Sequence, residues 1–89
     1  MTKATIHQTY FYTSDLALAG AISTVKSPPD HITNSNSDSN KKEFAFKREE
    51  GLDEAIQAFW NHKLRVDPLD YYTNLRILKN RIREGLRNG

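Results

Sequence analysis

The clearest hydrophobic pattern lies near the end of the chain, where apolar side chains recur at the spacing of one helix face. They follow one another in steps of four, three and four: Tyr71, Leu75, Leu78 and Ile82. Asp67 is suited to cap this helix, Pro68 to occupy its first position, and Asp70 to interact with its dipole in the first turn. The pattern predicts a helix over residues 67–87 with one face in the core.

The first third of the chain predicts a strand followed by a short helix. Residues 6–12 are rich in aromatic and β-branched side chains, which favours a strand. Residues 13–15 then supply a hydroxyl cap and a first-turn carboxylate for a helix that must end before Pro28 and Pro29. Gly20 weakens this helix by about 1 kcal/mol relative to alanine, so we expect a close backbone contact there.

Two further strands and a second helix are predicted in the middle of the chain. Residues 31–33 favour a short strand, and residues 34–40 form a polar tract that we expect to be a mobile hairpin loop. Residues 41–48 alternate with Phe44 and Phe46 on one face, as in a half-buried strand. Apolar residues then recur at helical spacing from Leu52 to Trp60, behind an acidic first turn.

The predicted order is β-α-β-β-α-α, which indicates a small α+β fold. A right-handed crossover makes the first two strands parallel, and the third can lie between them, antiparallel to both. We therefore expect a three-stranded mixed sheet with the helices packed on one face. Residues 1–89 are expected to form a single domain, with a flexible N-terminus at 1–5, the polar loop at 34–40 and a frayed C-terminus at 85–89.

Composition limits the possibilities further. A chain of 89 residues that is 37% hydrophobic has room for one modest core. It has no cysteine, which excludes disulfides, thiolate metal sites and a cysteine nucleophile. No apolar run approaches the roughly 18 residues that span a bilayer, and the N-terminus lacks the order of a signal peptide, so we expect a cytoplasmic protein without a membrane partner.

Positive charge is concentrated at the end of the chain. The formal net charge is only +2, but residues 76–89 hold five basic and one acidic side chain. Four of the cations follow one another along one predicted helix face: Arg76, Lys79, Arg83 and Arg87. This basic face can contact the phosphates of a nucleic acid. A solvated helix face, with cations favoured near the C-terminal end of the dipole, explains the same pattern more simply.

Two aromatic residues are candidates for a partner surface. Trp60 follows Phe59 and Tyr72 follows Tyr71, so one member of each pair must point away from the main core. Trp60 and Tyr72 lie off the core faces and are of the residue types that interfaces favour. We predict that they contribute to a partner patch or a homodimer seam.

Catalytic and cofactor sites are not indicated. The histidines His7, His31 and His62 are scattered and have no partner at metal-ligand spacing. The carboxylates between Glu49 and Glu54 are explained by a helix start, and the chain has neither a phosphate-binding glycine loop nor a nucleophile elbow. We expect no enzyme activity, no metal and no cofactor.

Several segments together are similar to one known family. They are Thr13-Ser14-Asp15-Leu16 with Leu18-Ala19, Phe44-Ala45-Phe46, Phe59-Trp60-Asn61 with Val66-Asp67-Pro68, and Tyr71-Tyr72 with Leu78-Lys79-Asn80-Arg81-Ile82. With these segments the chain resembles a family of small uncharacterised bacterial and phage proteins, catalogued as a domain of unknown function. The resemblance covers nearly the whole chain and implies a fold but no activity.

These observations lead to one main functional hypothesis and two alternatives. The first is a non-enzymatic module that docks a macromolecular partner, either another protein or a second copy, through the last helix and adjacent aromatics. The second is a regulator that binds nucleic acid through the basic helix face. The third is a phage or mobile-element protein that inhibits a host nuclease or polymerase.

Overall fold

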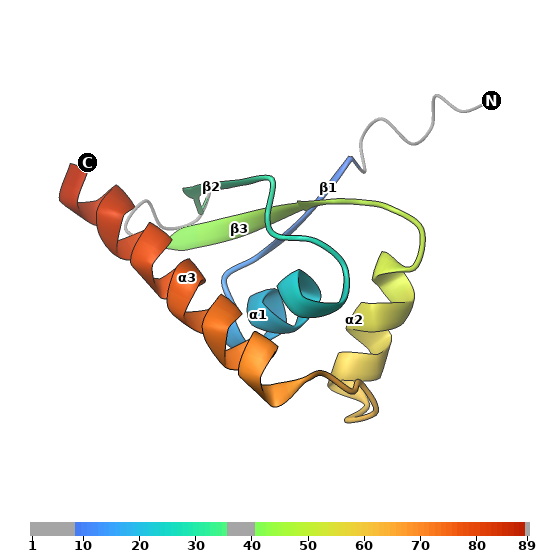
Figure 1. Cartoon of the computed structure of the whole chain (residues 1–89). Coiled ribbons are helices and arrows are strands. Elements are labelled where there is room, and N and C mark those ends of the chain that lie inside the picture. The colour runs from blue at the N-terminus through green and yellow to red at the C-terminus, as the bar shows by residue number, and fades with distance from the viewer. Residues whose placement is uncertain (1–8, 36–40, 89) are drawn as a thin grey trace.

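The computed structural model describes residues 9–35 and 41–88, with residues 85–88 described by their backbone alone. The described elements follow the predicted order: β1 (Tyr10–Thr13), α1 (Leu16–Val25), β2 (His31–Asn34), β3 (Lys42–Lys47), α2 (Leu52–Trp60) and α3 (Pro68–Asn88). The predicted α+β fold is therefore confirmed (Figure 1). The expected flexible segment at 1–5, the start of the first strand at 6–8 and most of the polar loop at 34–40 lie outside the described residues.

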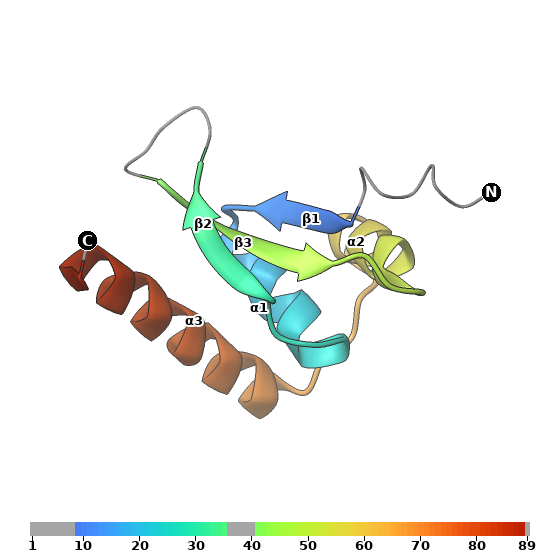
Figure 2. The ribbon, with the colours of Figure 1, turned by 90° about the horizontal axis from the view of Figure 1, so that it is seen from above.

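The sheet has the strand order β1-β3-β2, with β3 in the centre (Figure 2). In the register Phe11 lies opposite Phe46, and Ile32 lies opposite Phe44. Both hydrogen-bonded pairs are antiparallel, so β1 and β2 run in the same direction on either side of β3, as the crossover rule predicts. The described sheet is therefore antiparallel, and the expectation of a mixed sheet was wrong, because the parallel strands β1 and β2 are separated by β3 and do not pair with each other.

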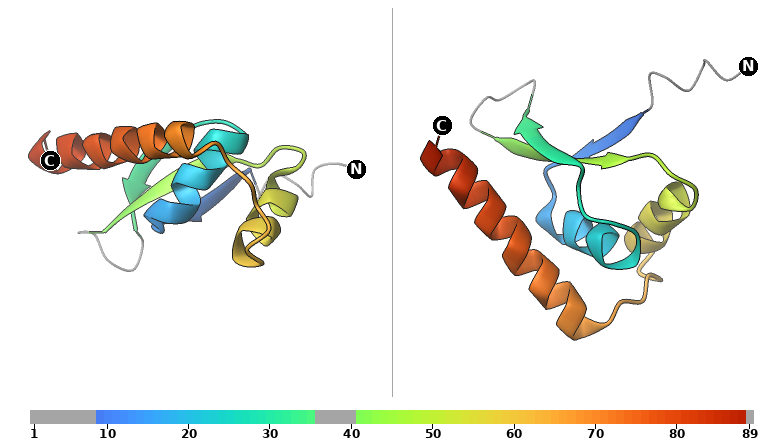
Figure 3. Two further views of the ribbon diagram at one scale, coloured as in Figure 1. Left: turned by 60° about the horizontal axis from the view of Figure 1, so that its bottom comes forward. Right: turned by 45° about the horizontal axis from the view of Figure 1, so that its top comes forward.

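All three helices lie on one side of the sheet, where α1 sits between α2 and α3 (Figures 1 and 3). The buried core joins this side of the sheet to the helices, and its members are Leu18, Ala19, Ile22, Phe44, Phe46, Leu52 and Leu78. The period of two along β3 directs Phe44 and Phe46 into this core, as predicted, and leaves the opposite face of the sheet without a helix.

The cap of α1 differs from the expectation in one detail. A hydroxyl cap with Asp15 in the first turn was expected, but Asp15 is itself the cap, and its Oδ1 accepts a hydrogen bond from the Leu18 N–H at 3.1 Å. Thr13 Oγ1 instead accepts from the Asp15 N–H at 3.0 Å. The reason is that the helix begins at Leu16, which places the carboxylate rather than a hydroxyl at the capping position.

The end of α2 reverses the chain toward α3. The His62 N–H donates to the Phe59 carbonyl at 3.1 Å, and the Lys63 N–H donates to the Ala58 carbonyl at 2.8 Å. These two bonds form a Schellman motif, which requires a left-handed backbone at the residue after the cap. His62 occupies that position with φ of 62°, where glycine is the usual residue.

The predicted close contact at Gly20 is made with α3. A Cβ atom at Gly20 would lie 2.6 Å from Leu75 Cδ2 and 3.3 Å from Tyr71 Cε1, so α3 approaches the α1 backbone directly. Near this point the Tyr71 hydroxyl donates to the Ala17 carbonyl at 3.2 Å, and Asn74 Nδ2 donates to Thr24 Oγ1 at 3.0 Å. These contacts fix both the position and the rotation of α3.

Candidate functional site

The inner face of α3 is the face that the sequence predicts. Leu78 is buried in the main core and Ile82 packs against that core. Asp67 Oδ2 accepts a hydrogen bond from the Asp70 N–H at 2.9 Å, so the predicted cap is confirmed. The helix ends at Asn88, before Gly89. Because the inner face is fixed in this way, the opposite face of α3 is directed toward solvent.

A solvent-exposed face of α3, next to the inner face, carries five exposed side chains in steps of three, four, three and four. They are Leu69, Tyr72, Arg76, Lys79 and Arg83, and we call this set the outer stripe. Leu69 is 71% exposed and Tyr72 is 57% exposed. Three of the four predicted cations, Arg76, Lys79 and Arg83, therefore lie on one helix face. The side chain of the fourth, Arg87, is outside the part of the chain whose side chains the structure describes. The stripe combines an apolar end with a basic end.

The cations of the outer stripe form no ion pair with any acidic side chain that the structure describes. Within residues 9–35 and 41–84, ion pairs join Asp30 to Lys47 and Arg48 to Asp53, and none involves α3. The Arg76 guanidinium lies over the Tyr72 ring, 5.8 Å from its centroid. Such a cation–π contact holds both side chains in place without neutralising the charge.

Trp60 is exposed as predicted but does not join the outer stripe through a ring contact. Its side chain is 54% exposed at the end of α2, and its ring meets the ring of Phe59 edge-on at 4.9 Å. Tyr72, by contrast, is paired with Arg76 on α3. The two predicted aromatic candidates therefore lie on separate elements, each held by its own neighbour.

Sequence reasoning missed other exposed apolar residues. Leu69, Ile77 and Tyr12 are all about half exposed or more, and none was named as a candidate. Among the described residues, four of the five large apolar side chains that are exposed lie within positions 60–77. Leu69 could have been found from its spacing, because it lies three residues before Tyr72 and seven before Arg76.

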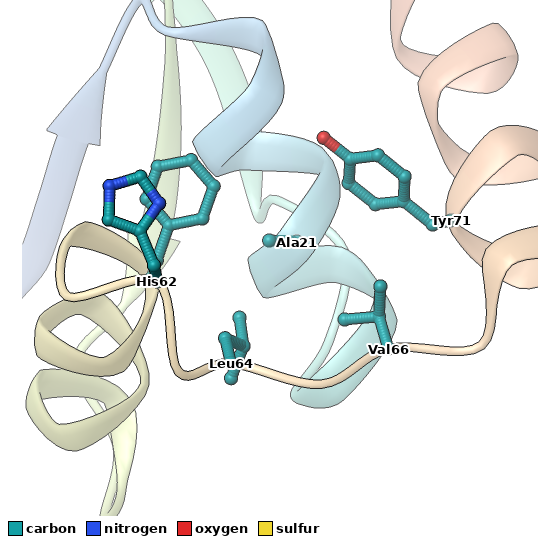
Figure 4. Close-up of a pocket in the computed structure, with 6 residues that line it drawn as sticks. Ala21, His62, Leu64, Val66 and Tyr71 are labelled. Carbon is teal, nitrogen blue, oxygen red and sulfur yellow. The ribbon is translucent and has the colours of Figure 1, made fainter.

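A cleft of about 310 Å³ lies between α1, the end of α2 and the start of α3 (Figure 4). It is lined by Ala21, Phe59, His62, Leu64, Val66 and Tyr71. The lining is mostly apolar, and the hydroxyl of Tyr71 is already bonded to the Ala17 carbonyl. This volume is at the lower limit of small-molecule sites.

The helix-free face of the sheet carries a small polar and aromatic cluster. Asp30 Oδ2 lies 2.9 Å from His31 Nδ1, and the rings of Tyr10 and His31 meet edge-on at 5.0 Å. The hydrogen bond from His31 lowers the pKa of the Asp30 carboxyl below its usual value, with smaller contributions in the same direction from Lys47 and Tyr10. In the described part of the chain, no three His, Asp or Glu side chains come together so as to hold a metal ion. His7 lies outside that part.

Comparisons with known proteins add a family but no relative of known activity. No curated protein and no solved structure matches the chain. Within the described residues no helix is both long and apolar enough to cross a bilayer. A family model described as a domain of unknown function, DUF5659, matches residues 8–84. That match spans every strand and nearly all of α3, and the chain therefore belongs to the DUF5659 family.

Proposed function

We propose that this domain is a non-enzymatic binding module that docks a protein partner through the outer stripe of α3, with Trp60 as a neighbouring contact. The observation that carries the proposal is that Leu69 and Tyr72, the two most exposed large apolar side chains among the described residues, lie three residues apart on one face of α3. Exposed apolar side chains that gather in one region are typical of interaction sites. Tyrosine, tryptophan and arginine are also the residues that dominate binding energy at protein interfaces.

The fold supports this proposal by presenting the stripe on a rigid element. Leu75 and Leu78 hold the inner face of α3 against α1 and the core, so the outer side chains keep fixed relative positions. The Arg76–Tyr72 contact further restricts two of them before any partner arrives. Preorganisation of this kind lowers the entropy that association costs.

Partner binding is tested by removing one exposed aromatic side chain at a time. The tagged protein is expressed in its own host, and the proteins that co-purify with Tyr72→Ala, Trp60→Ala and the parent are quantified. Tyr12→Ala is a matched control, because Tyr12 is 49% exposed but lies on the helix-free face of the sheet. We expect Tyr72→Ala to lower recovery of a specific partner at least tenfold and Tyr12→Ala to leave it unchanged. Equal recovery with Tyr72→Ala and Trp60→Ala, in variants with parental circular dichroism, would refute the proposal.

Binding of nucleic acid is the second candidate. It is favoured by the exposed cations Arg76, Lys79 and Arg83, which pair with no acidic side chain within residues 9–35 and 41–84. Phosphate contacts release counterions, so the affinity for a labelled duplex or single strand would fall steeply between about 50 and 200 mM salt. Lys79→Glu would then abolish binding. The absence of binding at low salt would exclude this candidate, and a steep salt dependence removed by Lys79→Glu would favour it over the protein partner.

A further inference from the structure

We propose that the outer stripe binds an acidic amphipathic helix of a partner protein, aligned along α3. This inference rests on the proposed function and names the partner's chemistry. It is drawn from the spacing, charge and apolar content of the five side chains that form the stripe: Leu69, Tyr72, Arg76, Lys79 and Arg83.

The spacing of the stripe matches a second helix. Steps of three and four residues alternate from Leu69 to Arg83, which is the repeat by which two helices pack side by side. With a rise of 1.5 Å per residue, these fourteen steps extend over about 21 Å. A helix of about four turns that carries its own residues at the same spacing can contact the whole stripe at once.

The charge of the stripe requires acidic groups on the partner. Arg76, Lys79 and Arg83 are exposed, and the ion pairs of the described residues use other side chains. A second copy packed in parallel would bring the same three cations against one another, and repulsion would oppose that dimer. An antiparallel copy would place Lys79 and Arg83 against the apolar end of the other stripe, which offers them no acidic group. Glutamates or aspartates at matching positions instead form ion pairs that become stronger as water is excluded.

The apolar end of the stripe distinguishes a protein from a nucleic acid. Leu69 and Tyr72 are the most exposed large apolar side chains among the described residues, and burying them requires apolar groups on the partner. A phosphate backbone offers none. The Tyr72 ring already has Arg76 over it, so it is not free on both sides for base stacking. The aliphatic stems of the arginine and lysine side chains add apolar surface that a helix can cover.

The test uses synthetic peptides and nuclear magnetic resonance of the full chain. The probe is an acetylated 21-residue helix with leucine and glutamate on one face at alternating steps of three and four. The first control has the same composition but two internal prolines, and the second is a 20-base-pair DNA duplex. We expect the helical peptide to shift the backbone amides of residues 69–83 in a saturable way below about 1 mM, which is a binding free energy near −4 kcal/mol. The proline peptide should bind at least tenfold more weakly.

Two matched pairs of charge reversals test which residues bind the peptide. The double variant Arg76→Glu, Lys79→Glu should bind the peptide with an affinity at least tenfold lower than that of the parent. The control variant Lys63→Glu, Arg65→Glu makes an equal charge change at two exposed positions before α3, and its affinity should fall less than threefold. The inference is overturned if the two pairs of substitutions have equal effects, or if the proline peptide binds as tightly as the helical one. Tighter binding of the DNA duplex, or a dimer of the protein in light scattering, would overturn it as well. If the peptide fails but Tyr72→Ala still loses its cellular partner, the proposed function stands and only the acidic-helix partner is wrong.

Discussion

Replacement of Gly20 by alanine tests the contact that sets the rotation of α3 and directs the outer stripe to solvent. In an exposed helix this change would stabilise the protein by about 1 kcal/mol, because alanine is the better helix former. At Gly20 the new Cβ would lie 2.6 Å from Leu75 Cδ2, about 0.8 Å inside the 3.4 Å at which ordinary van der Waals contact begins. The substitution therefore overpacks the interface between α1 and α3.

The sign of the expected change in the free energy of unfolding follows from comparing the cost of overpacking with the gain in helix propensity. Overpacking of a tight contact costs about 1–3 kcal/mol, which exceeds the propensity gain of about 1 kcal/mol over most of that range. We predict a net loss of about 1 kcal/mol in the free energy of unfolding. Leu75→Ala removes the atom that clashes, so in that background Gly20→Ala should stabilise the protein by about 1 kcal/mol.

The assay is urea unfolding followed by far-ultraviolet circular dichroism for the parent, the two single variants and the double variant. With a urea dependence of about 1 kcal/mol/M for a domain of this size, a change of 1 kcal/mol moves the midpoint by about 1 M. These four proteins form a double-mutant cycle, which should give a coupling free energy of about 2 kcal/mol between positions 20 and 75. Stabilisation by Gly20→Ala in the parent, or additive effects in the double variant, would refute the close approach of α3.

Three further predictions concern other parts of the fold. His62→Gly should raise the free energy of unfolding by about 0.5–1 kcal/mol in the same assay, because His62 has a positive φ that glycine adopts without strain. A decrease in that free energy would contradict the prediction. Leu78→Ala should lower that free energy by about 2–5 kcal/mol, since Leu78 is fully buried in the core. A loss below about 1 kcal/mol would place it outside the core. Titration of Asp30 by nuclear magnetic resonance should give a pKa below 3.8, and His31→Ala should raise it toward that value. Because the folded-state pKa is the lower one, the stabilisation from Asp30 is present above pH 3.8 and is lost as the pH falls through the folded pKa.

The regular parts of the fold could be predicted from local patterns. The inner face of α3 follows from Tyr71, Leu75 and Leu78 at helical spacing, and β3 follows from the alternation around Phe44 and Phe46. The strand order follows from the helical connection between β1 and β2, which makes these strands parallel and lets β3 lie between them, antiparallel to both. In each case the governing interaction is either local or set by a general packing rule.

Details that depend on where an element begins could not be predicted. Asp15 rather than a hydroxyl caps α1 because the helix begins one residue later than expected, and a one-residue shift changes the capping group. The left-handed backbone at His62 depends on the turn that joins α2 to α3. A histidine at that position carries no local signal of the kind a glycine gives.

The candidate surface was predicted only in part. The cations Arg76, Lys79 and Arg83 were recognised from their spacing, and the exposure of Tyr72 was inferred from its neighbour Tyr71. Leu69 was missed although its spacing to Tyr72 and Arg76 places it on the same face of the helix. Its exposure is decided by the rotation of α3 on α1, and that rotation is set by long-range contacts such as the one at Gly20.

The most direct test of the docking surface is site-specific photo-crosslinking in the native host, with benzoylphenylalanine in place of Tyr72. The same probe in place of Tyr12, an equally large exposed side chain on the helix-free face of the sheet, is the control. We predict a crosslink from position 72 to an acidic helical segment of one protein, absent from position 12 and lost when Arg76 and Lys79 are changed to glutamate. A crosslink from position 72 only to nucleic acid or to a second copy, or equal crosslinking from both positions, would contradict the account.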